Sequence, residues 1–217
     1  MTRTPQRPAA CLFDLDGLLL DTEPLQGRAW QEAARQFGAE LSPGQLRALR
    51  GRRRLDCAAE VLRVLPDGIS VEDLLAVREP IAARLLPQAP AMPGARHLVE
   101  RCRDLAIPTA LATSSAAAAV AIKAAPHPWL DLITLRVMGD DPELLKGKPA
   151  PDIFQIALER LGVEAPGAWA FEDSVAGSQA AHAAGCRVLV LAPPDADRAA
   201  YPAGVVWLTS LREIDLG

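Results

Sequence analysis

Two aspartates lie two residues apart in this chain: Asp14 and Asp16 follow an apolar run from Ala9 to Phe13 and precede Gly17. A short apolar run of this kind predicts a buried strand. Residues i and i+2 of an extended chain point the same way, so both carboxylates should face one crevice at the carboxyl end of the strand. Open α/β sheets bind their ligands there. Carboxylates this close repel each other unless a cation, a proton or hydrogen bonds intervene, which makes the stretch a candidate site.

The second half of the chain alternates between strand and helix patterns. The patterns predict strands at 107–112, 132–137, 168–171, 187–191 and, more weakly, 205–208, and helices at 95–106, 116–125, 151–161 and 176–184. Alternating strands and helices imply right-handed crossovers and a parallel sheet. The predicted fold class is therefore α/β, with a parallel sheet flanked by helices.

The stretch between the first strand and residue 90 has no convincing strand. Its apolar spacing predicts a helix from Pro24 to Phe37, with Asp21 or Thr22 placed to cap it, and further helices at 43–49, 55–64 and 71–86. Turn residues gather at 89–94 and indicate a boundary. We expect a core domain made of residues 1–20 and 91–217, and a helical insertion at 21–90.

Composition excludes several classes of partner. A net charge of −4 argues against nucleic acid as the main partner, and the apolar runs are too short to span a bilayer. The four cysteines are scattered, and the first eight residues lack the apolar region of a signal peptide. We therefore expect a cytoplasmic protein with free thiols, no membrane contact and, since nothing in the sequence demands a partner, a monomeric state.

Polar residues follow two other predicted strands and precede one helix. Thr113 and Ser114 follow the second strand, Glu172 and Asp173 follow the fourth, and Lys148 lies just before a helix. A parallel sheet brings such strand ends to one edge. Hard carboxylate ligands with few imidazoles suit Mg²⁺, and a hydroxyl, exposed amides and a lysine suit a phosphoryl group. Together they indicate Mg²⁺-dependent phosphoryl transfer to a carboxylate.

Each of these motifs alone has a simpler interpretation. An Asp-x-Asp-Gly sequence can be a turn or a calcium loop, but Leu18 and Leu19 stand where an EF-hand loop needs a ligand and a glycine. The Thr-Ser-Ser and Glu-Asp sequences could cap helices, and the Gly-Lys-Pro sequence could be a solvated turn. Their joint appearance, in order and at strand ends, favours a functional site.

The motifs resemble those of the haloacid dehalogenase (HAD) superfamily phosphatases, in particular the β-phosphoglucomutase-like subfamily. The resemblance covers essentially the whole chain and rests on four segments, Phe-Asp-Leu-Asp-Gly-Leu-Leu-Leu-Asp-Thr-Glu at 13–23, Leu-Ala-Thr-Ser-Ser at 111–115, Gly-Lys-Pro-Ala-Pro-Asp-Ile-Phe at 147–154 and Phe-Glu-Asp-Ser-Val-Ala-Gly at 171–177. It implies a Rossmann-like core with an α-helical cap domain inserted just after the first motif.

The resemblance also implies roles for individual residues. Asp14 corresponds to the nucleophile that forms an aspartyl-phosphate, and Asp16 to the general acid/base. Thr113 and the Ser114 amide correspond to the groups that bind the phosphate oxygens. Lys148 corresponds to the cation that neutralises the negative charge of the phosphate and of the nucleophile.

The same resemblance implies a Mg²⁺ site. Its ligands would be an Asp14 oxygen, the backbone carbonyl of Asp16 and Asp173, with Glu172 at or just outside the directly bound ligands. A metal and a lysine would keep Asp14 ionised, while the side chain of Asp16 stays free to carry a proton.

The cap is expected to choose the substrate, a small phosphorylated metabolite. Arg54 corresponds to an arginine with which the mutase branch holds a second phosphate, although it could also be a solvated arginine. Glu23 could contact a substrate hydroxyl or cap a helix. The mutase branch carries a histidine where this chain has Gln26, which cannot act as acid or base. This favours hydrolysis of a sugar or polyol phosphate over two alternatives, a phosphosugar mutase and a non-catalytic phosphometabolite binder.

Overall fold

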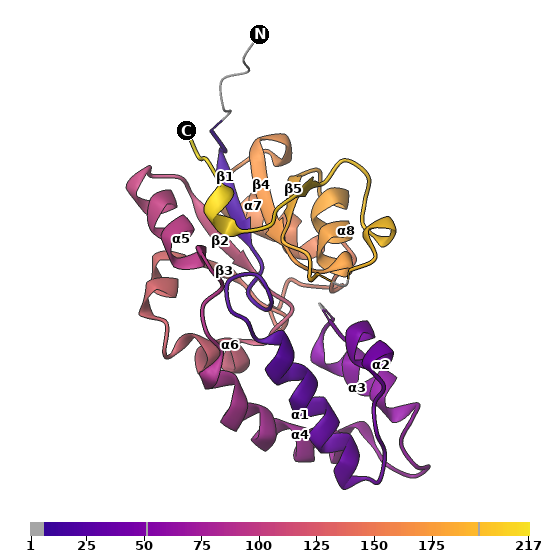
Figure 1. Cartoon of the computed structure of the whole chain (residues 1–217). Helices are drawn as coiled ribbons and strands as arrows, with labels where there is room; N and C mark the ends of the chain where they lie inside the picture. Colours follow the sequence, from indigo (N-terminus) through magenta and orange to yellow (C-terminus); the bar gives the residue numbers. More distant parts are fainter. Residues whose placement is uncertain (1–6, 51, 195) are drawn as a thin grey trace.

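A computed structural model describes residues 7–50, 52–194 and 196–217 of the chain. The first six residues of the predicted core domain lie outside these described residues. Figure 1 shows the sheet and its flanking helices at the top and a group of helices below.

Within the described residues a single sheet of six parallel strands forms the core, in the order β3-β2-β1-β4-β5-β6. Its strands are β1 (Ala10–Phe13), β2 (Thr109–Ala112), β3 (Leu135–Val137), β4 (Ala168–Glu172), β5 (Arg187–Val190) and β6 (Val206–Trp207). The chain adds β2 and β3 on one side of β1, then β4, β5 and β6 on the other. The strand order therefore reverses between β1 and β4, where open α/β sheets form their ligand crevice. The α/β prediction is confirmed.

Helices cover both faces of this sheet. They are α5 (Ala95–Asp104), α6 (Ala117–Ala124), α7 (Asp152–Leu161) and α8 (Val175–Ala183). Along β1, Cys11 and Phe13 join the apolar cluster under α5, whereas Ala10 and Leu12 join the cluster under α7 and α8. Burial on both faces explains why β1 is a continuous apolar run, as parallel strands usually are.

The third strand is shorter than the sequence predicts. Residues 132–137 were expected as one strand, but Pro128–Leu132 form a 3-10 turn, η2, and the strand begins only at Leu135. Pro128 opens the turn, where its missing N–H is not needed. Trp129 and Leu130 are buried in the cluster that also holds residues of α5. Tertiary burial of these two side chains therefore favours the turn over extended backbone at 132–134.

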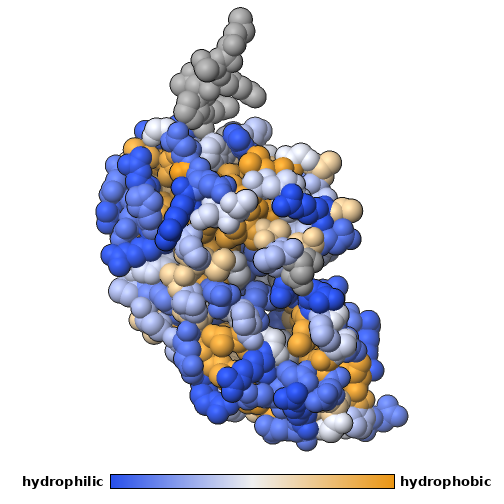
Figure 2. Space-filling view, in the orientation of Figure 1, coloured by the Kyte–Doolittle hydropathy of each residue, from blue (hydrophilic) through white to orange (hydrophobic). Residues whose placement is uncertain are grey.

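The lower group of helices has a hydrophobic core of its own. It comprises α1 (Glu23–Gln36), α2 (Pro43–Ala48), α3 (Arg54–Leu62) and α4 (Val71–Leu85), followed by the 3-10 turn η1 (Leu86–Gln88). Trp30, Val61 and Leu74 are among the buried residues of this cluster. In the space-filling view a notch separates this group from the sheet-bearing part (Figure 2). We retain 21–90 as the proposed extent of the cap and 1–20 with 91–217 as that of the core.

The two connections between the parts run side by side. Leu20 and Ala91 form an antiparallel bridge. The Asp21 N–H donates to the Pro90 carbonyl at 2.9 Å, and the Met92 N–H donates to the Leu19 carbonyl at 2.9 Å. The chain therefore leaves and re-enters the sheet-bearing part at a single point.

Among the described residues, the helices are all too short or too polar to cross a lipid bilayer.

Two helical glycines allow a test of the packing around the strand ends. A Cβ on Gly177 in α8 would lie 2.0 Å from Glu172 Oε1, whereas a Cβ on Gly27 in α1 would meet nothing within 4 Å. Gly27→Ala should stabilise the protein by about 0.5–1 kcal/mol, because alanine loses less backbone entropy in a helix. Gly177→Ala should destabilise it by about 1–3 kcal/mol through overpacking. Urea unfolding measures both, and equal effects of the two substitutions would contradict the close approach of α8 to Glu172.

Candidate active site

The two aspartates follow β1 at the point where the strand order reverses. The Asp14 N–H donates to the Phe171 carbonyl of β4 at 3.1 Å, which continues the β1–β4 ladder past the end of the strand. Asp14 is 6% exposed and lies beside Glu172, the last residue of β4. The structure therefore brings the predicted strand ends to one edge of the sheet.

Lys148 joins three chain segments at this edge. Its Nζ lies 2.5 Å from Asp14 Oδ1, 2.5 Å from Glu172 Oε1 and 2.9 Å from the Ala112 carbonyl at the end of β2. All three protons of the ammonium group thus have an acceptor. Burial alone would lower the pKa of Lys148, but the two carboxylates outweigh it and raise that pKa. Lys148 is therefore a fixed positive charge against the two carboxylates.

The carboxylates of Asp14, Glu172 and Asp173 form a compact, buried acidic group. One oxygen from each lies within 4.8 Å of the others. Burial raises the pKa of Asp14, although Lys148 opposes the shift; burial together with neighbouring carboxylates raises the pKa of Glu172 to about 7 and that of Asp173 well above its usual range. Three carboxylates facing a single lysine leave an excess of negative charge. Such a set of hard oxygen donors fits a divalent cation of the Mg²⁺ type.

Backbone details hold Asp173 in this group. The Tyr201 hydroxyl donates to the Asp173 carbonyl at 2.8 Å. Gly17 has a φ of +87°, and a Cβ there would lie 2.2 Å from Asp173 Oδ2. Only glycine adopts this conformation without strain and leaves room for the carboxylate. The glycine after the aspartate pair is thus required by the close approach of the Asp173 side chain, just after β4.

Thr113 and Ser114, the residues predicted to hold the phosphate, directly follow β2 and line a cavity at the sheet edge. Thr113 is 1% exposed, and its Oγ1 accepts a hydrogen bond from the Ser115 N–H at 3.1 Å. The alternative that this sequence caps a helix is wrong, because the N-cap of α6 is Ala116 and the Ala117 N–H donates to Asp140 at 2.9 Å.

Asp16 is held by three side chains that sequence reasoning did not assign to it. Thr22 Oγ1 donates to Oδ1 at 2.6 Å, Ser115 Oγ donates to Oδ2 at 2.8 Å, and Lys123 Nζ lies 2.7 and 2.5 Å from the two oxygens. Burial would raise the pKa of Asp16, but the charge and hydrogen bonds of these donors lower it overall. Thr22 is the N-cap residue of α1, as one of the two predicted alternatives, but its hydroxyl donates to Asp16 and makes no capping hydrogen bond to the helix.

A signal for Lys123 exists in the sequence. Lys123 follows Val120 by three residues, so the two share one face of a helix whose other members are alanine, valine and isoleucine. A lone lysine on the buried face of an apolar helix must find an anion. The sequence does not say which one, because that contact is tertiary.

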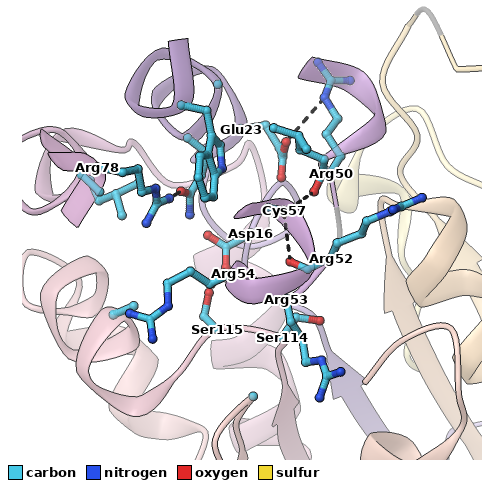
Figure 3. Close-up of a pocket in the computed structure, with 18 of the residues that line it drawn as sticks. Asp16, Glu23, Arg50, Arg52, Arg53, Arg54, Cys57, Arg78, Ser114 and Ser115 are labelled. Atoms are coloured by element: carbon cyan, nitrogen blue, oxygen red, sulfur yellow. Dashed lines mark hydrogen bonds and ion pairs between the residues drawn. The ribbon is translucent and has the colours of Figure 1, made fainter. Parts of the chain in front are cut away.

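A cavity of about 790 Å³ lies between the sheet edge and the lower helices. Asp14, Asp16 and Thr113 line it from the sheet side. Figure 3 shows Asp16 and Ser115 together near the centre, with the arginines around them. A second cavity, of about 770 Å³, reaches Lys148 and Asp173 from the other side of α2 and α3.

The two predicted cap residues line the first cavity, and Glu23 lies near enough to the acidic group for its charge to raise the pKa of Asp173. Arg54 Nη1 contacts Glu79 at 3.1 Å, and Glu23 Oε2 lies 3.4 Å from Arg50 Nε. Burial and the nearby negative charge of Asp16 raise the pKa of Glu23 to about 8. Because the Arg54–Glu79 pair is about half exposed, it adds little stability, and Arg54 can exchange Glu79 for a ligand.

Arg78 is a cavity residue that sequence reasoning missed. It is 6% exposed, its guanidinium lies 4.6 Å from the Trp30 ring centre, and it donates to Gln26 Oε1. Within the described part of the chain its Nε has no hydrogen-bond partner. Gln26 therefore has a defined structural role here, as the acceptor for a buried arginine beside the cavity.

Comparisons with known proteins agree with this geometry. A family model described as haloacid dehalogenase-like hydrolase matches residues 8–185. (DL)-glycerol-3-phosphatase 2 of Arabidopsis thaliana is 33% identical over 192 residues, covering 86% of this chain and 80% of that protein. Hexitol phosphatase A of Escherichia coli is 33% identical over 192 residues, covering 86% and 85%. The crystal structure of CbbY from Rhodobacter sphaeroides in complex with phosphate superposes with a TM-score of 0.82 at 27% identity, covering 95% and 96%.

The acidic group predicts an unusual pH dependence of stability. Carboxyl groups titrate near about 4 in an unfolded chain, whereas Glu172 and Asp173 keep protons to higher pH in the folded state. The folded state therefore binds more protons, and the free energy of unfolding falls as pH rises from about 5 to about 8. In EDTA the Tm should drop by about 3 °C or more over this range.

Millimolar Mg²⁺ should reverse that drop, and more strongly at the higher pH, because protons and the cation compete for the same oxygens. Glu172→Gln should flatten the slope, while Glu143→Gln, at an exposed carboxylate, should leave it unchanged. A Tm in EDTA that stays level or rises with pH would contradict the assignment of this group as a cation site.

Proposed function

The chain belongs to the haloacid dehalogenase-like hydrolases, and we propose that it is a phosphatase that hydrolyses small sugar or polyol phosphomonoesters. The observation that carries the proposal is Lys148, buried between Asp14 and Glu172 at the reversal of strand order, where Asp14 lines a cavity of metabolite size. The named phosphatase activities of the two similar proteins support the same reaction class.

We assign the first chemical step to Asp14. Its carboxylate attacks phosphorus, a bond from carboxylate oxygen to phosphorus forms, and the bond from phosphorus to the substrate oxygen breaks. Lys148 offsets the negative charge of the carboxylate and the phosphoryl group throughout. A divalent cation held by Asp14, Asp173 and the Asp16 carbonyl, with Glu172 beside it, would supply further electrostatic stabilisation there, and Mg²⁺ is our proposal for its identity.

Asp16 is proposed to move the protons of both steps. Its side chain lines the cavity, so it can protonate the departing alcohol and then accept a proton from the water that cleaves the aspartyl-phosphate. Thr113 and the Ser114 amide, also on the cavity wall, would hold the phosphoryl oxygens.

The residues of the cavity favour hydrolysis over transfer between two positions of a sugar. Gln26 accepts a hydrogen bond from Arg78 and has no proton to exchange at neutral pH, so it cannot serve where the mutase branch has a histidine. The mutase alternative is therefore not favoured. A binder without catalysis is disfavoured too, since both aspartates, Lys148 and the acidic group lie together.

The substrate is proposed to be a phosphorylated metabolite whose distal end meets the arginines of the cavity. Arg54 and Arg78 offer guanidinium groups on the cap side, suited to hydroxyl groups or a second anion. A cytoplasmic location and a monomeric state stay predictions from the sequence.

The reaction class is tested with a panel of hexose, pentose and polyol phosphates, with Mg²⁺ and with EDTA. We expect release of inorganic phosphate that requires the metal, and no accumulation of an isomer. Isomer formation without phosphate release would favour the mutase, and no metal-dependent turnover of any substrate would favour the binder.

The aspartate roles predict large effects on turnover. Asp14→Asn and Asp16→Asn should each lower kcat by at least about 10²-fold, because one removes the nucleophile and the other the proton carrier. Asp131→Asn, at a carboxylate with 77% side-chain exposure, is the matched control and should retain normal turnover. Full activity of either active-site variant would remove the corresponding assignment.

Arg54 should affect binding more than chemistry. Arg54→Met is expected to raise KM by about tenfold with kcat nearly unchanged, the loss of one charged hydrogen bond to the distal end of the substrate. Arg63→Met removes an arginine from the end of the same helix that does not line the cavity, and should leave KM unchanged. An unaltered KM in Arg54→Met would indicate that this arginine is merely solvated.

A further inference from the structure

Lys123 is a fully buried lysine for which the proposed function has no role. It lies in α6, whose remaining residues are alanine, valine and isoleucine, and its exposed fraction is 0%. Taking an ammonium group out of water is costly unless it is paired and hydrogen-bonded. Its complete burial therefore points to a specific partner rather than to general packing.

The partner is Asp16. Lys123 Nζ lies 2.7 Å from Asp16 Oδ1, 2.5 Å from Oδ2 and 2.7 Å from Ser115 Oγ. Ser115 Oγ in turn donates to Asp16 Oδ2 at 2.8 Å. Within the described residues these three acceptors account for all three N–H groups of the ammonium. Lys123 has no proton left for a substrate, so any effect on the reaction passes through Asp16 or through Ser115, which itself donates to Asp16.

The arrangement also sets where the Asp16 carboxylate points. Asp16 and Ser115 line the 790 Å³ cavity, whereas Lys123 does not, so the ammonium lies behind the carboxylate as seen from the cavity. Thr22 Oγ1 completes the set with its bond to Oδ1 at 2.6 Å. Donors from α6, from the end of β2 and from the connection to α1 therefore hold one carboxylate at one place on the cavity wall.

We propose that Lys123 is a positioning residue that fixes the Asp16 carboxylate at the place from which it meets the leaving oxygen; the proposal rests on the phosphatase function above. The structure distinguishes the two lysines of the site by their partners. Lys148 acts on Asp14 and the phosphoryl group, and Lys123 acts on Asp16 and the leaving group.

This role predicts a dependence on the leaving group. An alkyl phosphate releases an alkoxide unless a well-placed acid protonates it, whereas p-nitrophenyl phosphate releases a phenolate that needs no proton. If the Asp16 carboxylate is no longer held in place, phosphoryl transfer from the alkyl phosphate should slow, whereas transfer from p-nitrophenyl phosphate should be nearly unchanged. A residue that only supported the fold would slow both alike.

The experiment measures the first phosphoryl transfer in single turnovers, with the enzyme in excess over glycerol 3-phosphate or p-nitrophenyl phosphate and with Mg²⁺ present. Lys123→Met should lower the rate for glycerol 3-phosphate by about 10²-fold and that for p-nitrophenyl phosphate by less than about threefold. Lys123→Arg, which keeps a cationic donor, should recover part of the loss. Lys146→Met, at an exposed lysine outside the site, is the control and should behave as wild type.

A double variant tests whether Lys123 works through Asp16. In the Asp16→Asn background, Lys123→Met should cause no further loss with glycerol 3-phosphate, because the group that it positions no longer carries a proton. If Lys123→Met does not fold, Ser115→Ala removes one contact of the same network and should show the same substrate dependence to a smaller extent.

Equal losses on both substrates, no loss, or additive losses in the double variant would overturn the proposal. A wild-type protein that releases no phosphate from any member of the hexose, pentose and polyol phosphate panel with Mg²⁺ would instead refute the phosphatase function, so the two failures are distinguishable.

Discussion

The two aspartates at the end of one buried strand, Asp14 and Asp16, each form an ion pair with a different lysine. Asp14 and Asp16 lie on the same side of the chain after β1, and repulsion between them would favour protonation of one. Lys148 reaches Asp14 from the segment before α7, and Lys123 reaches Asp16 from α6. Each carboxylate is thus neutralised from a different direction, so that two chemically identical side chains have different surroundings. The division of labour that we propose for them depends on this separation.

The sheet topology makes that arrangement possible. Because strand order reverses beside β1, the ends of β2 and β4 flank the aspartates on both sides, and Lys148 is held by acceptors on all three strand ends. Burial of the acidic group on the β4 side, together with its excess of negative charge over its lysine, raises the pKa of Glu172 and Asp173. The protein therefore gives up stability at neutral pH to keep oxygen ligands gathered where a cation can bind them.

Sequence reasoning reached the sheet and the strand-end residues for a physical reason. Apolar runs that end in carboxylates or hydroxyls are local signals, and the rule that parallel strands end at one edge converts them into a site. It was wrong at residues 132–134, where the burial of Trp129 and Leu130 favours a turn. It placed Thr22 correctly at the start of α1 but did not predict that the Thr22 hydroxyl binds Asp16. It missed Lys123 and Arg78 because their partners are distant in sequence, and only the packed structure brings them together.

The adjacent connections at Leu20 and Ala91 carry a consequence for how such a chain can diversify. Since the chain leaves and re-enters the sheet-bearing part at neighbouring points, the segment between Leu20 and Ala91 is equivalent to one long loop whose two ends are held together by the bridge. Lengthening, shortening or exchanging that loop costs little in closure entropy and leaves the strand ends untouched. An ancestral or engineered chain could therefore acquire a new substrate by exchanging the segment as a whole, without rebuilding the reaction centre.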